Sequence, residues 1–253
     1  MERVIQLHTF GRGGIHPDPM KRETRDRPIE PIAPLPSDVW LPLLQHIGEP
    51  SQPLVKKGDK VVRGQKIADG GPNGVPLHAT VSGKVRPIER RPHPTLVLAD
   101  SIAIQREGEA ELEFPQDPGW RGISREEALE RIREAGIVGL GGAAFPTHRK
   151  LSLPKGVAVD TLVLNGAECE PYLTSDYRLM LAEPEAIVEG AFAMARIVGV
   201  RRILVGIETD KGKAIDALRD AAAEIQSALV ESGISFVVVP CEVRYPQGAE
   251  RQL

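Results

Sequence analysis

The pattern of apolar residues changes near Trp120, and this change constrains the fold more than any other feature of the chain. Between Leu54 and Ile104, apolar pieces of two to four residues alternate with glycine turns, a pattern typical of a small all-β barrel or sandwich. After Trp120 the chain alternates apolar strands with helical stretches, which predicts an α/β domain with a largely parallel sheet. The expected order is a strand at 159–165, a helix at 184–198, a strand at 201–208, a helix at 210–232 and a strand at 234–240.

The composition of the chain argues against several kinds of binding partner. The 253 residues carry 32 basic and 35 acidic side chains, a net charge of −3, so no overall positive field exists to attract nucleic acid or anionic lipid. The two cysteines, Cys169 and Cys241, lie far apart, which argues against a disulfide framework or a cysteine-rich metal cluster. The histidines show no metal-site spacing. No apolar run approaches the roughly 20 residues that span a bilayer, and no signal peptide is visible, so we expect a soluble cytoplasmic chain.

The segment from Gly14 to Pro36 is dense in proline and charge, which disfavours helix. We interpret it as an extended arm that wraps over its neighbour, with a disordered tail as the alternative. Its basic side chains are interleaved with acidic ones, which favours a solvated mixed-charge surface over a phosphate site. The basic residues are Lys21, Arg22, Arg25 and Arg27, and the acidic ones are Glu23, Asp26 and Glu30.

A glycine-rich run from Gly136 to Lys150 follows a predicted helix at 124–135, whose start carries a capping box of Ser124 and Glu127. Four glycines and two alanines within nine residues expose the backbone to a ligand. Gly139, Gly141 and Ala144 satisfy a dinucleotide fingerprint, but that fingerprint requires a preceding strand, and here a helix precedes it. The loop is therefore predicted only to meet a flat or anionic ligand through its amides.

Other polar residues near this run allow more than one interpretation. Phe145 is equally consistent with stacking on a nucleotide ring and with core packing. Lys150 could pair with a phosphate or a flavin carbonyl, or lie on a solvated surface. Glu168 and Glu170 could serve a metal, a sugar hydroxyl or proton transfer, although paired acids after a strand more often cap a helix. Cys169 has no evident base partner, which disfavours nucleophilic catalysis.

Two longer segments of the sequence resemble known families. The glycine-turn segment resembles the barrel-sandwich module of biotinyl and lipoyl carriers, but residues 69–76, which would form the carrier hairpin, contain no lysine. GIVGLGGAAFPTHRKL followed by VLNGAECEPYLTSD resembles the flavin-binding core of the flavin-bearing subunit of respiratory complex I. With GRGGIHP, PLLQHIGEP and the barrel module placed before that core, the whole chain resembles the RnfC family, the C subunits of the Rnf/Rsx ion-translocating ferredoxin:NAD oxidoreductases.

This resemblance implies non-covalent FMN, with NADH stacked over it, and no catalytic side chain because the flavin carries the chemistry. The residues it assigns to FMN are Gly139, Gly141, Gly142, Ala143, Lys150, Asn165, Glu168 and Tyr245. Those it assigns to NADH are Phe145, Glu170 and Glu250, and it assigns no metal ligand. The chain departs from the family pattern at Ala144, usually glycine, and at Ala167, where the complex I relatives carry aspartate.

The resemblance also predicts organisation and partners. It implies an extended arm at 1–40, a barrel-sandwich domain at 41–112 and a Rossmann-like FMN/NADH α/β domain at 113–253. The family's [4Fe–4S] clusters are expected only in a C-terminal region absent from this sequence. We expect an NADH-linked flavin oxidoreductase that assembles with other Rnf subunits, serves ferredoxin indirectly, and lies on the cytoplasmic face of the inner membrane through its partners. The alternatives are a cobalamin reductase-like flavoprotein and a non-catalytic scaffold that docks partners.

Overall fold

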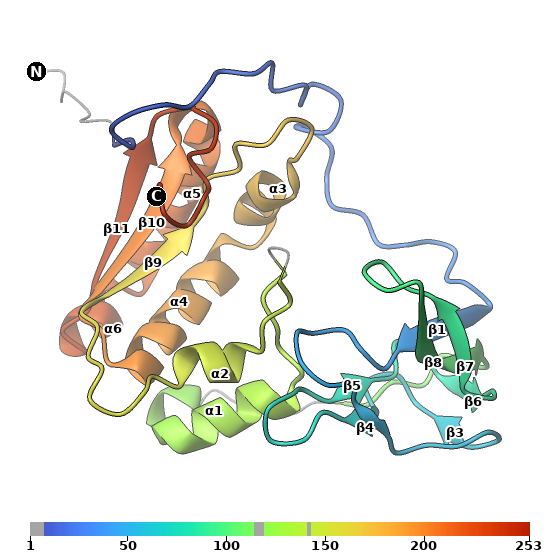
Figure 1. Ribbon diagram of the computed structural model, residues 1–253. Coiled ribbons are helices and arrows are strands. Elements are labelled where there is room, and N and C mark those ends of the chain that lie inside the picture. The colour runs from blue at the N-terminus through green and yellow to red at the C-terminus, as the bar shows by residue number, and fades with distance from the viewer. Residues whose placement is uncertain (1–7, 114–118, 141–142) are drawn as a thin grey trace, which may run out of the picture. The chain divides into compact units, whose positions relative to one another are not determined.

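The computed structural model describes residues 8–113, 119–140 and 143–253, which form two compact units (Figure 1). The barrel unit comprises Ile32–Lys155. The α/β unit comprises Gly156–Leu253 together with the N-terminal segment that ends at Pro31. The sequence predicts a domain boundary at residue 113, whereas the contacts group the described part of 113–155 with the barrel.

The barrel unit contains two antiparallel sheets, which confirms the predicted all-β module. One sheet has the order β1-β8-β6-β3, with β7 also paired to β8, and the other has the order β2-β4-β5. Their inward side chains form one apolar core in which Ile67, Ile102 and Ile104 have no exposed surface. The strands are β1 (Asp38–Pro42), β2 (Gln52–Pro53), β3 (Lys60–Val61), β4 (Lys66–Asp69), β5 (Leu77–His78), β6 (Gly83–Val85), β7 (Glu89–Pro92) and β8 (Leu98–Arg106).

The turn between β4 and β5 stands where a carrier domain would present its modified lysine. Here it is closed by a hydrogen bond from the Gly74 amide to the Gly70 carbonyl at 3.1 Å. The nearest lysine along the chain, Lys66, is bound to Asp69 at 2.8 Å and to Glu134 at 2.9 Å. This turn therefore packs against the segment that follows the barrel strands instead of presenting a free amine.

In the described part of the barrel unit, three helical elements follow the strands: η1 (Trp120–Gly122), α1 (Arg125–Glu134) and α2 (Thr147–Leu151). The Ser124 hydroxyl accepts a hydrogen bond from the Glu127 amide at 3.1 Å, so α1 begins where its cap predicts. The chain turns after α1 at Gly136, where φ is +72°. A Cβ at that position would lie 2.9 Å from the Pro76 carbonyl oxygen, so glycine permits both the turn and the close approach to the barrel.

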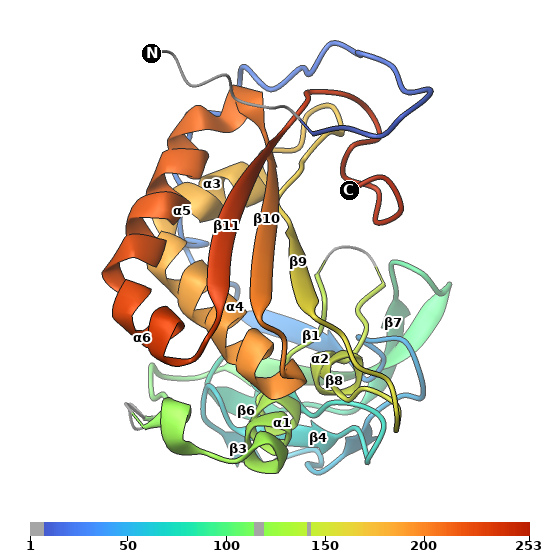
Figure 2. The same cartoon turned by 90° about the vertical axis from the view of Figure 1, so that its left-hand side faces the viewer.

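The α/β unit is built on a parallel three-stranded sheet with the order β11-β10-β9, which confirms the predicted fold class. Its strands are β9 (Thr161–Asn165), β10 (Arg202–Glu208) and β11 (Ser235–Cys241). Along β10, Ile203, Val205 and Ile207 alternate and are buried. Helices α4 and α5 pack on one face of this sheet (Figure 2).

The helices of this unit match the predictions in part. Helix α4 (Pro184–Val198) has the predicted bounds, with proline in its first turn and Gly199 at φ +85° after its end. The single helix predicted at 210–232 is wrong, because the backbone at Ile225 leaves the helical range (φ −102°, ψ 14°). That stretch instead forms η2 (Thr209–Lys211), α5 (Gly212–Glu224) and α6 (Gln226–Glu231). Helix α3 (Ser175–Ala182) is not predicted.

We use the name N-terminal arm for residues 8–31, the described part of the N-terminal segment that belongs to the α/β unit. The arm has no helix or strand of its own; His8 forms a bridge with Cys241 and Ile15 forms one with Tyr245. It therefore runs beside the end of β11 and the C-terminal segment. Among the described residues, no helix has the length and apolar character needed to cross a bilayer.

Candidate functional site

The residues assigned to FMN and NADH fall into two sets. Gly139, Ala143, Phe145 and Lys150 belong to the barrel unit. Gly141 and Gly142 lie outside the described residues. The remaining five, Asn165, Glu168, Glu170, Tyr245 and Glu250, belong to the α/β unit.

We call residues 136–146 the glycine loop. Its base is closed by backbone hydrogen bonds, from the Gly139 amide to the Phe145 carbonyl at 2.9 Å and from the Thr147 amide to the Ile137 carbonyl at 3.0 Å. Toward the tip, the Leu140 side chain is 94% exposed. Among the described residues, a Cβ at Gly139 would meet a single atom within 4 Å, the Phe145 carbonyl oxygen at 3.8 Å. The loop therefore offers open backbone, as a close-fitting ligand requires.

The structure shows how Ala144 is accommodated at a position where the family pattern usually has glycine. Its φ is +46°, in the left-handed region that favours glycine. The alanine is held there in part because its carbonyl accepts a hydrogen bond from the Ile47 amide of the barrel at 3.2 Å. The barrel thus supports the glycine loop directly, a contact that no sequence signal revealed.

Two hollows in the barrel unit adjoin the loop. One, of about 220 Å³, is lined by Gly139 and Leu140 together with Gln45 and Pro76. The other, of about 740 Å³, is lined by Ala143 and Ala144 with barrel residues that include Trp40, His46 and His93. The larger volume lies within the usual range for small-molecule and cofactor sites.

The aromatic and basic side chains at the end of the loop are accessible. The Phe145 ring is 37% exposed, so it is not part of the core. The Arg149 guanidinium lies 5.7 Å from its centroid. Lys150 is exposed on α2, and its ammonium group has no hydrogen-bond or ion-pair partner among the described residues. His148, by contrast, is buried, and burial lowers the pKa of its imidazole.

The acidic segment, residues 165–170, follows β9. The Asn165 amide group donates to the Gly248 carbonyl at 2.6 Å, and its side-chain oxygen accepts from the Ala167 amide at 3.2 Å. These bonds join the segment to the C-terminal turn, while one N–H and one lone pair of the side chain stay available to a ligand. The Gly248 amide in turn donates to the Cys169 sulfur at 3.3 Å.

Glu168 is 2% exposed and caps the next helix. Its Oε1 accepts a hydrogen bond from the Asp176 amide in the first turn of α3 at 2.8 Å. Glu168 therefore caps the helix, as one of the two interpretations predicted. Burial raises the pKa of its carboxyl group. Burial also raises the pKa of the Cys169 thiol, which keeps it protonated and weakly nucleophilic. Glu170, Tyr245 and Glu250 are exposed.

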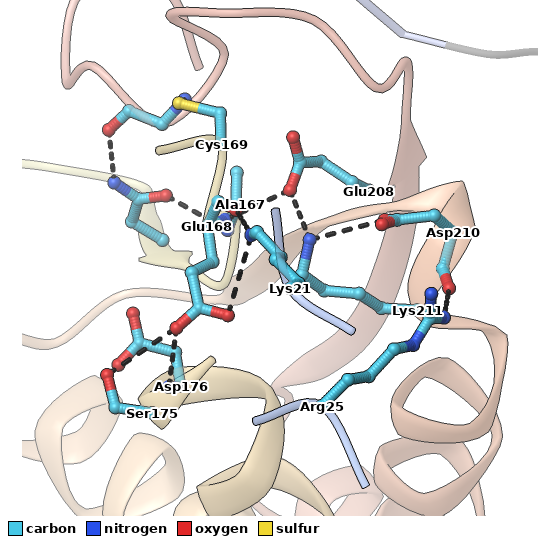
Figure 3. A network of polar contacts seen from close by, with 12 residues as sticks. Lys21, Arg25, Ala167, Glu168, Cys169, Ser175, Asp176, Glu208, Asp210 and Lys211 are labelled. Atoms are coloured by element: carbon cyan, nitrogen blue, oxygen red, sulfur yellow. Dashed lines mark hydrogen bonds and ion pairs between the residues drawn. The ribbon is translucent and has the colours of Figure 1, made fainter. Parts of the chain in front are cut away.

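A cluster of charged side chains surrounds the Glu168 backbone (Figure 3). The Glu168 amide donates to Glu208 Oε2 at 3.1 Å, and that oxygen also pairs with the Lys211 ammonium. Lys211 Nζ lies 3.2 Å from Asp210 Oδ1 as well. Sequence reasoning missed these residues, although their position at and just after the carboxyl end of β10 is itself a signal, since ligands of open α/β sheets bind at strand ends.

The N-terminal arm contributes to the same cluster, which corrects the prediction of a solvated mixed-charge surface. Lys21 donates to the Glu168 carbonyl, and Arg25 donates to the Asp210 carbonyl and lies 5.5 Å from the Tyr177 ring centroid. Only Arg22 and Arg27 of the basic group are exposed as predicted. The prediction was wrong for Lys21 and Arg25 because the acceptors lie more than a hundred residues away along the chain.

Comparisons with known proteins match both halves of the chain. Residues 8–109 match the family described as RnfC Barrel sandwich hybrid domain, and residues 132–253 match the family described as Nuo51 FMN-binding domain. The chain is 44% identical over 245 residues to the C subunit of the proton-translocating ferredoxin:NAD(+) oxidoreductase complex from Clostridium ljungdahlii, covering 96% of this chain and 51% of that protein.

It is 41% identical over 251 residues to the Na(+)-translocating counterpart from Acetobacterium woodii, covering 97% of this chain and 54% of that protein. The chain thus spans about half the length of these curated relatives. Among solved structures, an NAD+-reducing [NiFe]-hydrogenase in the H2-reduced state matches 53% of this chain and 23% of its own, with 24% identity and a TM-score of 0.48.

Proposed function

Because the chain belongs to the RnfC family, with an RnfC barrel sandwich hybrid domain followed by a Nuo51 FMN-binding domain, we propose that it binds FMN and NAD(H). In this proposal it is the NADH-linked flavin part of an ion-translocating ferredoxin:NAD oxidoreductase. FMN, when bound, supplies the exchange between hydride transfer and single-electron transfer.

The observation that carries the proposal is the glycine loop, which lies within the FMN-binding match at 132–253. Its backbone is open at Gly139, an exposed aromatic ring stands at Phe145, and cationic side chains follow at Arg149 and Lys150. Sterically open backbone with adjacent cations suits a phosphate, and an exposed ring suits a planar base. These features together fit a flavin nucleotide.

In this proposal each residue has a specific task. Gly139 and Ala143 would present backbone to the flavin, and Lys150 would bind its phosphate or a ring carbonyl. Asn165 would use its remaining donor and acceptor, with Glu168 close by and Tyr245 in contact. Phe145 would stack on NADH, while Glu170 and Glu250 would accept hydrogen bonds from its hydroxyls. Gly141 and Gly142 are proposed as further backbone contacts.

We further propose that the chain acts as part of a membrane-bound complex, held at the cytoplasmic face by its partner proteins. The two named relatives belong to ferredoxin:NAD(+) oxidoreductase complexes, and this supports the assignment. We also propose that functional domains follow the family matches, with a boundary near residue 113, even though residues before Lys155 pack with the barrel.

Titration of the protein with FMN, followed by flavin fluorescence, tests the proposal. We expect saturable quenching, with weaker binding of riboflavin because it lacks the phosphate that Lys150 would contact. The FMN-loaded protein should oxidise NADH with ferricyanide as acceptor. Absence of saturable FMN binding would contradict the proposal and favour a scaffold that docks partners.

A further inference from the structure

The N-terminal arm brings a positive charge to the centre of the acidic segment. The Lys21 ammonium donates a hydrogen bond to the Glu168 carbonyl and lies 3.9 Å from Glu168 Oε2. The Lys21 side chain is 11% exposed and that of Glu168 is 2% exposed. The two residues are 147 positions apart in the sequence, so this contact exists only because the arm folds back onto the α/β unit.

Charged side chains hold both backbone polar groups of Glu168. Lys21 binds its carbonyl, and Glu208, paired with Lys211, binds its amide (Figure 3). Hydrogen bonds to charged groups are stronger than those between neutral groups. The orientation of the peptide units on either side of Glu168 therefore depends on two lysines from outside the acidic segment.

Removal of a cation from this cluster would leave a buried carboxylate without a partner. A cavity of about 60 Å³ adjoins it, lined by residues that include Lys21, Glu168, Glu208 and Lys211. Within the described part of the chain, Glu168 Oε2 and Glu208 Oε1 are buried and accept no hydrogen bond. Without Lys21, Glu168 would lose its ion pair, and Lys211 is already paired with Glu208 and Asp210. An unpaired buried carboxylate is strongly unfavourable, so the ionised state of Glu168 depends on the arm.

We propose that Lys21 is a positioning residue for the nucleotide site, acting through Glu168. This inference rests on the proposed function and extends it, since it makes the N-terminal arm part of the FMN and NADH site. Lys21 fixes the Glu168 peptide and favours the ionised Glu168 carboxylate, which accepts the hydrogen bond from the Asp176 amide. The arm then contributes to binding without touching the ligand.

The pH dependence follows from the groups that face Glu168. They are Lys21 from the arm, Lys211 and Glu208 from the end of β10, and Ser175 and Asp176 from α3. Burial raises the pKa of the Glu168 carboxyl, while Lys21 and Lys211 pull it back down. Loss of Lys21 removes one of these two opposing cations. The pH at which Glu168 takes up a proton must then move upward.

The experiment compares Lys21→Met, Lys21→Arg and Arg22→Met by FMN titration across the acid range. Arg22 is the matched control, because it is a neighbouring cation on the same arm and is exposed. We expect Lys21→Met to weaken FMN by about tenfold or more and to shift the acidic limb of the binding profile to higher pH. Lys21→Arg should restore most of the affinity, and Arg22→Met should match the wild type.

The outcomes separate this inference from the proposed function. If the wild type binds no FMN, the proposed function fails. If the wild type binds FMN and Lys21→Met gives the same affinity and pH profile, the inference is overturned. Should Lys21→Met not fold, the double variant Lys21→Met/Glu168→Gln removes the uncompensated charge; it should fold, bind weakly and lose the acidic limb. Wild-type binding by a folded double variant would also overturn the inference.

Discussion

The glycine loop and the acidic segment are both assigned to the proposed nucleotide site, but different interactions hold them in place. Backbone hydrogen bonds close the base of the glycine loop, and its described side chains near the tip are exposed. The acidic segment is held by buried charges, with Glu168 bound from both sides. The first presents bare backbone, and the second positions side chains. Substitutions at the open positions of the loop should therefore act on binding, whereas those that break the buried charge pairs of the acidic segment should also act on stability.

The largest effect should come from breaking the buried pair behind the acidic segment. Lys211 and Glu208 have side chains only 4% and 1% exposed, and loss of one partner of such a pair costs about 3–5 kcal/mol. We expect Lys211→Met to lower the free energy of unfolding by about that amount in urea denaturation. The control is Arg219→Met, whose exposed pair with Asp216 spans 3.9 Å and should matter little. Equal losses for both variants would contradict the comparison.

The next largest effect should distinguish two glycines of the loop by their influence on stability and on FMN affinity. Gly136→Ala places a Cβ at φ +72° and 2.9 Å from the Pro76 carbonyl oxygen, so it should cost at least about 1–2 kcal/mol of stability. Gly139→Ala adds its methyl group to open space, since the nearest atom lies at 3.8 Å, and should leave stability intact while weakening FMN. Thermal unfolding and FMN titration of both variants measure this. Retained FMN affinity in a stable Gly139→Ala protein would remove the loop from the site.

A pH effect on stability should follow from the buried Glu168 carboxyl group of the acidic segment. The folded-state pKa of Glu168 is raised above its ordinary value of 4.5, so its contribution to stability is fully present below pH 4.5 and is lost as the pH rises through the folded pKa. Relative to Glu168→Gln, the wild type should therefore lose stability over that window, by about 1.4 kcal/mol per unit of pKa difference. Chemical denaturation from pH 4 to pH 8 measures the difference. A difference independent of pH would exclude the raised pKa.

The smallest effect should be on NADH affinity alone, with little change in stability or in FMN affinity. Phe145 is 37% exposed, so Phe145→Ala should leave stability nearly unchanged. Aromatic stacking contributes about 0.5–1.5 kcal/mol, which corresponds to about a two- to twelvefold weaker affinity for NADH. FMN affinity should change much less. Equal loss of FMN and NADH would reassign the ring to the flavin.

Much of the fold could be predicted because its signals are local. The bounds of α4 follow from Pro184 in its first turn and Gly199 after its end. Ser124 marks the start of α1, and the strands of the parallel sheet follow from their apolar patterns. The glycine loop could likewise be identified as a candidate ligand-binding segment, because bare backbone is a property of the residues themselves.

The sequence by itself thus determined the two fold classes, the positions of α1, α4 and the three parallel strands, and the candidate segments. Only the tertiary structure decided that Lys21 meets Glu168, that Glu208 and Lys211 lie behind it, and that the barrel supports Ala144. It also decided the break at Ile225 and the grouping of residues up to Lys155 with the barrel. The physical reason is that capping and periodicity act within a few residues, whereas burial and charge pairing depend on segments far apart along the chain.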